Sequence, residues 1–183
     1  MAHANPEINW LRLAKAIEFY KENGFIYKEV PWTAPPEAQK VTLPEYEYSE
    51  KYWWSLVGSA EQSFIHLCLE EDLPKGDFVA LTPCFRYEKN LDERHQPYFA
   101  KVELFSCEDV TEENLKKKID LCFAWFESQC GNGRLEKIQT ESGVDIYLNG
   151  IEVGSYGIRT YKNFSWIFAT GHAEPRFSVA LKR

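Results

Sequence analysis

The chain has 183 residues, of which 44% are hydrophobic and 15% aromatic, enough for the core of one domain and too many for a disordered chain. Its formal net charge is −7, from 21 basic and 28 acidic residues, which argues against a protein that binds nucleic acid mainly through phosphates. No apolar run reaches the roughly 18 residues of a membrane span, and the start lacks the features of a secretion signal. The five cysteines include no Cys-x-x-Cys pair, which indicates reduced thiols rather than a zinc site. We therefore expect a single cytoplasmic domain over residues 1–183.

The first elements are predicted from helical signals. Asn5-Pro6-Glu7 matches a helix start, and apolar residues then recur at helical spacing as far as Gly24: Trp10, Leu13, Ala14, Ile17 and Tyr20. A short strand over 25–30 and a proline-rich loop over 32–44 are expected next. The pattern Ser59-x-x-Gln62 is a capping box and predicts the start of a second helix.

The rest of the chain favours strands joined by hairpins. A strand over 78–88 and a second over 98–105 are expected to pair in an antiparallel hairpin, followed by a helix capped by Thr111. Further strands are predicted near 134–140, 143–148, 151–160 and 166–169, with a turn at Asn149-Gly150 and a short last helix after Glu174. This order predicts an α+β fold with a mainly antiparallel sheet flanked by helices.

Charged side chains alternate with apolar ones along the predicted hairpin. Phe99, Lys101 and Glu103 share one face of their strand, and Arg86 and Glu88 share a face of the preceding strand. If the strands pair, cations and carboxylates meet on one sheet surface. The alternative is a solvated face with cross-strand ion pairs, which the pattern alone favours.

A second pair of carboxylates flanks the Asn149-Gly150 turn. Asp145 and Glu152 are diagonal neighbours in the expected hairpin and are suited to share Mg²⁺ with substrate phosphates, although two exposed carboxylates are the commoner arrangement. In strict alternation Arg159 points away from Glu152. It joins the same face only if a bulge intervenes, which the glycines of this strand allow.

Together these runs resemble the three motifs of class II aminoacyl-tRNA synthetases, in the family's order. The first helix and the strand closed by Pro31 resemble motif 1, a dimerisation element. Phe85-Arg86-Tyr87-Glu88, a loop with His95, and Phe99 resemble motif 2. Gly171-x-Ala173-x-x-Arg176 resembles motif 3, with alanine in place of a glycine and proline in place of the usual acidic residue before the arginine.

The segment 145–159 is most similar to the aspartyl- and asparaginyl-tRNA synthetases of that family. The lysine that the aspartate enzymes have near the capping-box helix is missing, since Ser63 and Phe64 stand there. The resemblance therefore implies a core related to this subclass without fixing the amino acid.

The resemblance also implies roles for the residues in ATP binding. Arg86 would hold the α-phosphate and the amino-acid carboxylate, and it is, with Arg176, an expected catalytic residue. Glu88 would bind the adenine amino group and Phe99 would stack on the ring. His95 and Arg176 would bind the terminal phosphates.

The remaining roles concern Mg²⁺ and the amino acid. Asp145 and Glu152 would hold the Mg²⁺ of the nucleotide, so that Glu152 also belongs to the ATP site. Four residues would bind the amino acid, the first at its α-amino group and the others at its side chain: Glu61, Arg159, Lys101 and Glu103.

The implied activity is the ATP- and Mg²⁺-dependent activation of an amino acid to its adenylate by a homodimer. The chain lacks an anticodon-binding domain and is acidic, so ammonia, a small molecule or a protein is a more suitable acceptor than tRNA. The alternative is a non-catalytic paralogue that binds a nucleotide or amino acid or serves as a partner subunit, which the altered motif 3 favours. Aminoacylation of tRNA with the help of another subunit is the third possibility.

Overall fold

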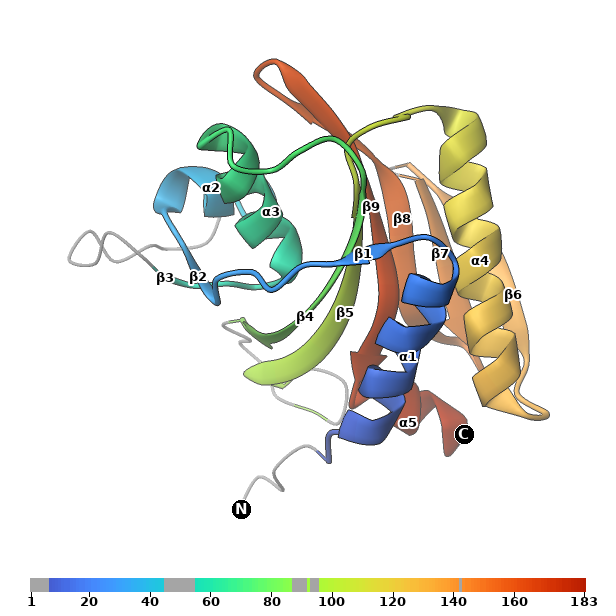
Figure 1. Cartoon of the computed structure of the whole chain (residues 1–183). Helices are drawn as coiled ribbons and strands as arrows, with labels where there is room; N and C mark the ends of the chain where they lie inside the picture. The colour runs from blue at the N-terminus through green and yellow to red at the C-terminus, as the bar shows by residue number, and fades with distance from the viewer. Residues whose placement is uncertain (1–6, 45–54, 87–91, 93–95, 142) are drawn as a thin grey trace.

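The computed structural model describes residues 7–44, 55–86, 92, 96–141 and 143–183 (Figure 1). The strands are β1 (Ile26–Tyr27), β2 (Thr33–Ala34), β3 (Ser55–Leu56), β4 (Asp77–Phe85), β5 (Tyr98–Ser106), β6 (Leu135–Thr140), β7 (Gly143–Leu148), β8 (Ile151–Tyr161) and β9 (Phe164–Glu174). The helices are α1 (Trp10–Glu22), α2 (Pro36–Lys40), α3 (Ala60–Leu69), α4 (Glu112–Cys130) and α5 (Arg176–Leu181).

Seven of the strands form one sheet in the order β1-β4-β5-β9-β8-β7-β6. β1 is parallel to β4, and every other neighbouring pair of this sheet is antiparallel. β2 and β3 pair with each other in a separate antiparallel ladder. The prediction of an α+β fold with a mainly antiparallel sheet is therefore confirmed. No helix in the described part of the chain is long and apolar enough to cross a membrane.

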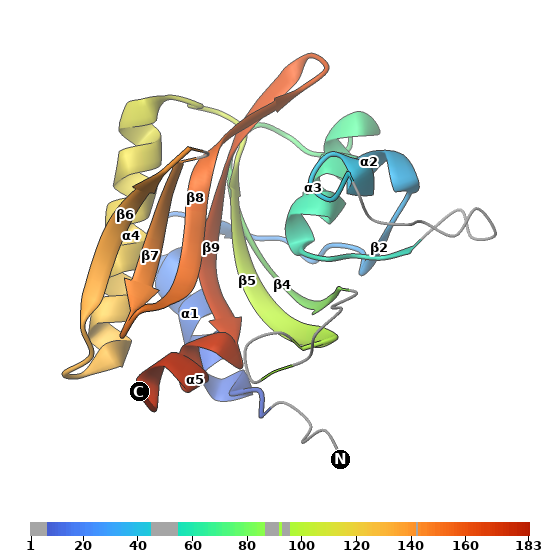
Figure 2. The ribbon, with the colours of Figure 1, turned by 180° about the vertical axis from the view of Figure 1, so that it is seen from behind.

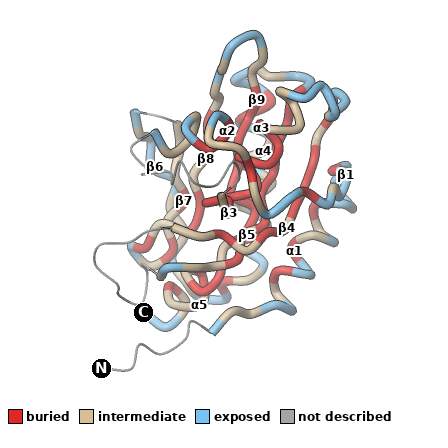
Figure 3. The backbone as a smooth tube through the Cα atoms, turned by 90° about the vertical axis from the view of Figure 1, so that its left-hand side faces the viewer, coloured by how far each residue is buried: buried red, intermediate tan, exposed pale blue. Residues whose placement is uncertain are grey.

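The two faces of the sheet are covered by different helices. α1 and α4 lie on one face, whereas α2 and α3 lie on the other (Figure 1 and Figure 2). The side chains of β4 alternate accordingly, since Val79 belongs to the core beneath α1 and α4 while Phe78 and Ala80 belong to the core beneath α3. Buried residues follow the strands and the inner sides of the helices (Figure 3). The sheet thus separates two hydrophobic cores.

The first helix begins later than the sequence predicted. α1 starts at Trp10 and is capped by Asn9, whose side chain accepts a hydrogen bond of 3.0 Å from the backbone N of Arg12. The predicted cap Asn5 lies outside the described residues. Trp10, which the spacing placed on the apolar side, is exposed, because the buried stripe of this helix is formed by Leu13, Ala16 and Tyr20.

The proline-rich segment 32–44 is not simply a loop, as the sequence predicted, because it contains β2 and α2. Pro36 is the first residue of α2, a position at which a proline's missing N–H removes no helical hydrogen bond. The buried amide of Gln39 donates to the carbonyls of Ala34 and Ser55, at 2.8 and 2.6 Å. These contacts join α2 to both strands of the small ladder.

Candidate functional site

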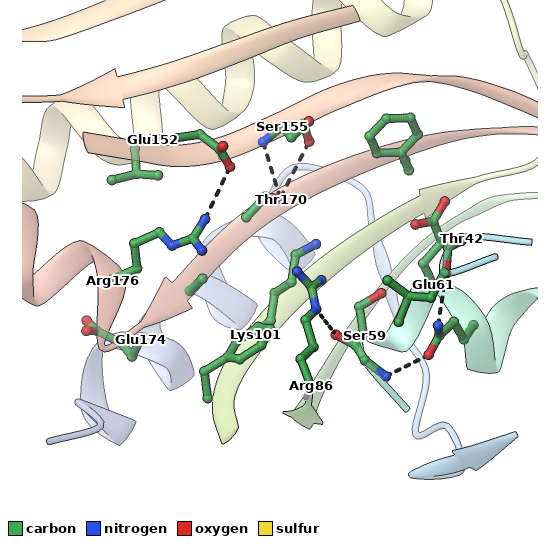
Figure 4. A pocket seen from close by; sticks show the side chains of 18 of the residues that line it. Thr42, Ser59, Glu61, Arg86, Lys101, Glu152, Ser155, Thr170, Glu174 and Arg176 are labelled. Carbon is green, nitrogen blue, oxygen red and sulfur yellow. Dashed lines mark hydrogen bonds and ion pairs between the residues drawn. The ribbon is translucent and has the colours of Figure 1, made fainter. Parts of the chain in front are cut away.

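A cavity of about 240 Å³ opens on the sheet face that bears α3, between this helix and the start of α5 (Figure 4). Its walls come from the first turn of α3, the end of β4, the middle of β5, and facing parts of β8 and β9. Seven of the residues predicted from the sequence line it: Glu61, Arg86, Phe99, Lys101, Glu152, Arg159 and Arg176. Segments far apart in the sequence therefore meet at one place.

A β-bulge in β8 brings Glu152 and Arg159 to the same cavity. Tyr147 pairs with Glu152 and Ile146 pairs with Gly154, so Val153 is an extra residue without a partner in the ladder. The extra residue reverses the alternation, so both ends of the strand point to the cavity face. The sequence predicted that Arg159 shares a face with Glu152 only if a bulge lies between them, and this bulge meets that condition.

A second bulge, in β9, sets the opposite wall. Glu103 pairs with Thr170 and Val102 pairs with His172, which leaves Gly171 unpaired. The hydroxyl of Tyr20 donates to the carbonyl of Gly171 at 2.9 Å, and that of Tyr156 donates to the carbonyl of Thr170 at the same distance. Two buried tyrosines thus supply hydrogen bonds to the backbone carbonyls at the bulge. Because of the bulge, Thr170 faces the cavity and His172 faces the other side of the sheet.

Glu61 and Arg159 form an ion pair in the cavity wall. One terminal nitrogen of Arg159 donates to both oxygens of Glu61 at 2.6 Å, and the indole N–H of Trp166 donates to Glu61 Oε1 at 2.8 Å. The guanidinium also lies over the ring of Phe168, 3.9 Å from its centroid. The Glu61 side chain is 5% exposed and that of Arg159 is 36% exposed, so the cation is the more exposed part of the pair, and both residues line the cavity.

Lys101 and Glu103 form a similar pair on β5. The ammonium of Lys101 lies 2.7 Å from a carboxylate oxygen of the fully buried Glu103. No group in the described part of the chain meets either oxygen in hydrogen-bonding geometry, so the contact is an ion pair without a well-directed hydrogen bond. Burial raises the pKa of Glu103 to about 6, although Lys101 acts to lower it. Lys101 lines the cavity, and Glu103 lies outside the lining.

Arg86 follows the last residue of β4 and lies between α3 and β5. Its Nε donates to the carbonyl of Gly58 at 3.2 Å, and its guanidinium lies 5.1 Å from the ring centroid of Phe99. The loop before α3 is fixed in turn by Gln62, which accepts from the N–H of Gly58 at 2.6 Å and donates to Thr42 at 2.9 Å. The predicted helix start is confirmed, but Gln62 reaches Gly58 rather than its capping partner.

Arg176 is the first residue of α5 and donates to Glu152 at 3.3 Å. Asp145 pairs with Ser155 and, like the rest of β7, lies outside the lining residues. No group of three or more His, Cys, Asp or Glu side chains suited to a metal occurs among the residues that the structure describes. Mg²⁺ commonly binds one or two carboxylates plus substrate phosphates, so Glu152 fits such an ion when a nucleotide supplies the other oxygens.

Two predicted residues, Glu88 and His95, lie outside the described part of the chain. Other lining residues were not predicted as site residues, among them four with polar side chains: Gln62, Ser155, Thr170 and Glu174. Gln62 had a signal in the capping box. The two hydroxyl residues had none, because their orientation depends on the bulges. Glu174 is part of the motif-3-like run, where the sequence drew attention to Pro175 instead.

Solved structures similar to this chain include aminoacyl-tRNA synthetases. Pyrrolysyl-tRNA synthetase from Desulfitobacterium hafniense matches with a TM-score of 0.73 and 14% identity, over 96% of this chain and 70% of that one. A second structure of that enzyme gives 0.71 and 16%, over the same shares. Seryl-tRNA synthetase from Pyrococcus horikoshii complexed with ATP gives 0.76 and 17%, over 93% of this chain and 49% of that one.

No protein-family model and no curated protein matches the sequence. At such low identities the structural likeness shows the fold alone. The chain has the fold of a class II aminoacyl-tRNA synthetase catalytic core. Its similarity to the aspartyl and asparaginyl subclass stays a prediction.

Proposed function

We propose that residues 1–183 form a single catalytic domain that binds ATP and an amino acid and joins them to an aminoacyl adenylate. The observation that supports this proposal is the convergence of four cations on one cavity: Arg86, Lys101, Arg159 and Arg176. They come from four different elements or their ends, and three of them correspond to positions in the motif-like segments. The ATP complex of the seryl enzyme, which has the same fold, agrees with a nucleotide site.

The distribution of charge supports a ligand with several anionic groups. Lys101 and Arg159 both line the cavity, whereas their carboxylate partners are less exposed: Glu103 is fully buried outside the lining, and Glu61 lines the cavity but is only 5% exposed. The surface offered to a ligand is therefore more positive than the residue count indicates. Phosphates and an amino-acid carboxylate are groups that such a surface binds.

The two ends of the cavity suit different parts of the reactants. Arg176 and Glu152 lie together at the α5 end, where we place the terminal phosphates, with Mg²⁺ held by Glu152 and, from the next strand, Asp145. Glu61 and Arg159 lie at the α3 end, where we place the amino acid. Its α-ammonium group would take over the Glu61 carboxylate from Arg159, which frees the guanidinium for the substrate's side chain.

The proposed reaction needs no nucleophile from the protein. An oxygen of the amino-acid carboxylate attacks the α-phosphorus in line, the bond to the β-phosphate oxygen breaks, and pyrophosphate leaves. Arg86, between the two ends, would neutralise charge on the α-phosphate, while Phe99 packs against adenine and Glu88 and His95 complete the nucleotide site. Lys101, supported by Glu103, would contact the amino-acid side chain. Mg²⁺ supplies charge neutralisation when bound.

We further propose a homodimer formed by the motif-1-like elements. Leu11 on α1 is 78% exposed and Ile26 on β1 is 58% exposed, and Trp10 and Tyr27 beside them are exposed as well. The two residues on α1 lie at its start and the two on β1 lie beyond the end of that helix, and exposed apolar side chains are typical of association surfaces. For the acceptor we retain ammonia, a small molecule or a protein ahead of tRNA, because of the net charge of −7, and we expect the protein to act in the cytoplasm.

Pyrophosphate exchange into ATP, measured with each standard amino acid in turn, tests this proposal. We expect exchange with one amino acid or a small group, and its loss in Arg86→Ala, because Arg86 is placed at the α-phosphate. Arg134→Ala, an exposed arginine on the far edge of the sheet, is the matched control and should retain activity. Exchange that persists in Arg86→Ala would contradict the assignment of this cavity.

The second candidate is a subunit that binds ATP or an amino acid without turnover. It is favoured by the internal pairing of Arg159 with Glu61 and of Arg176 with Glu152, which leaves each cation partly neutralised. Titration calorimetry separates the two. ATP binding without exchange for any amino acid supports the second candidate, whereas binding with exchange supports the first.

A further inference from the structure

A chain of buried polar contacts connects the cavity, which Glu174 lines, to α1. Glu174, which is fully buried, accepts hydrogen bonds from the guanidinium of Arg12 in α1 at 2.8 Å and from the backbone N of Ser178 in α5 at 3.2 Å. His172 Nε2 lies 3.0 Å from the same carboxylate. Arg12 also donates to the Ser178 hydroxyl at 3.0 Å. One carboxylate therefore joins α1, β9 and α5.

The protonation states in this chain follow from its partners. The indole N–H of Trp125 is only a donor and lies 3.2 Å from His172 Nδ1, so that nitrogen is the acceptor and Nε2 bears the proton of the neutral ring. Burial lowers the pKa of His172, which keeps the ring neutral. Burial alone would raise the pKa of Glu174, but its hydrogen bonds from His172, Ser178 and Arg12 outweigh burial and lower it. The carboxylate is thus ionised, and Arg12 is the cation in contact with it.

These contacts lie on both sides of Arg176 in the sequence. Glu174 precedes it by two positions and Ser178 follows it by two, and Arg12 binds both. The guanidinium of Arg12 also lies over the ring of Phe177, 5.2 Å from its centroid. The first turn of α5 is therefore fixed through Arg12 of α1, while Arg176 itself reaches Glu152 within the cavity.

We propose that Arg12 is a positioning residue for Arg176. It acts through Glu174 and Ser178 to hold the first turn of α5 in the orientation that directs the Arg176 guanidinium into the cavity. This proposal rests on the proposed function, in which Arg176 binds the terminal phosphates of ATP. In the sequence Arg12 has no signal of its own, since a single arginine in a helix is normally solvated.

The kinetic test uses Arg12→Met, Arg12→Lys and, as the matched control, Lys15→Met, which removes an exposed cation from the same helix. In pyrophosphate exchange, Arg12→Met is expected to raise the KM for ATP about tenfold, as loss of one well-placed charged contact does, and to leave the KM for the amino acid unchanged. Arg12→Lys should have a KM for ATP close to that of the wild type, because it keeps the positive charge. Added to Arg176→Ala, Arg12→Met should have no further effect, because both changes remove the same interaction. Additive effects would overturn the proposal.

The second measurement is independent of activity. The guanidinium ¹⁵Nε resonance of Arg176, assigned from its absence in Arg176→Ala, should shift or broaden in Arg12→Met and stay in place in Lys15→Met. An unchanged resonance in folded Arg12→Met would refute the positioning role even if exchange is observed. Should Arg12→Met not fold, Ser178→Ala removes one anchor and must move the same resonance. If the wild type shows no exchange, the proposed function fails, and the resonance still decides the role of Arg12.

Discussion

The guanidinium of Arg159 is held on two sides, by the Glu61 carboxylate at 2.6 Å and by the face of Phe168 at 3.9 Å from the ring centroid. A planar, delocalised cation suits both contacts, and a lysine ammonium does not. If this pair contacts the amino acid, Arg159→Lys should raise the KM for the amino acid at least about tenfold while the KM for ATP stays the same. Steady-state exchange kinetics measure both constants. Equal changes in the two would contradict a role at the amino-acid end.

The two carboxylates proposed for Mg²⁺ can be separated by substitution. Glu152 lines the cavity and Asp145 lies outside its lining, so Glu152→Gln should raise the Mg²⁺ concentration for half-maximal exchange more than Asp145→Asn does. A Mg²⁺ titration at saturating ATP measures this order. The reverse order would place the ion on the β7 side and refute the assignment to Glu152.

Glu103 makes the stability depend on pH in a direction opposite to that of most carboxylates. Its pKa in the fold is about 6, above the ordinary value of 4.5, so between these values the folded state binds more protons than the unfolded state. The free energy of unfolding should therefore fall as pH rises from 4.5 to 6, by on the order of 2 kcal/mol from this group.

Urea unfolding of the wild type and Glu103→Gln over this pH range isolates the contribution of Glu103. The stability of the variant relative to the wild type should increase as pH rises through the window. Glu113→Gln is a suitable control, because hydrogen bonding to Lys117 lowers the pKa of Glu113. A constant difference between wild type and Glu103→Gln would show that Glu103 is not a buried, partly protonated group.

The bulge at Gly171 should not tolerate a side chain. A Cβ there would lie 2.8 Å from a ring carbon of Tyr20 and 3.2 Å from the backbone carbonyl of Val102, and neither atom can move freely. Gly171→Ala is expected to lower the free energy of unfolding by about 1–3 kcal/mol. In Gly58→Ala the close atom is the terminal Cδ1 of Leu43, which can rotate away, so its cost should be smaller. Urea denaturation compares the two, and equal costs would contradict this account.

The proposed dimer surface is tested by charge insertion. Leu11→Glu should disrupt association, because it replaces an exposed apolar side chain of the motif-1-like elements with a carboxylate. Ile138→Glu, at an exposed position on the distant strand β6, should have no effect. Sedimentation velocity over a range of protein concentrations measures the oligomeric state of each variant. A monomeric wild type would refute the dimer.

Features with local causes were predictable from the sequence. The β4–β5 hairpin follows from alternation along two strands, and the turn at Asn149 and Gly150 follows from residues that tolerate the positive φ angles found there, 51° and 79°. The helix over 112–130 begins as predicted, since the Thr111 hydroxyl accepts from the N–H of Asn114. The turn and the helix start depend on neighbours within a few residues, and the hairpin depends on the alternation within each of its strands.

Features that depend on distant partners were not predictable. The bulge at Gly171 is satisfied by Tyr20, which lies 151 positions away, and β9 extends to Glu174 because β5 pairs with its last residues. Because the two bulges depend on distant partners, alternation along the sequence could not predict which face of the sheet Ser155 and Thr170 point to. The pairing of Arg159 with Glu61 joins residues 98 positions apart, so a separate role was expected for each residue and their contact was not predicted.

The bulge at Val153 also limits how this strand can change over evolution. Glu152 and Arg159 are seven positions apart, an odd number, and they face the same cavity only because one residue between them is out of step. A relative without the bulge would need an even separation to keep both residues in place. Any single-residue insertion or deletion between them would therefore exchange a cavity-facing side chain for a core-facing one, so changes in length here must occur in pairs or together with the gain or loss of a bulge.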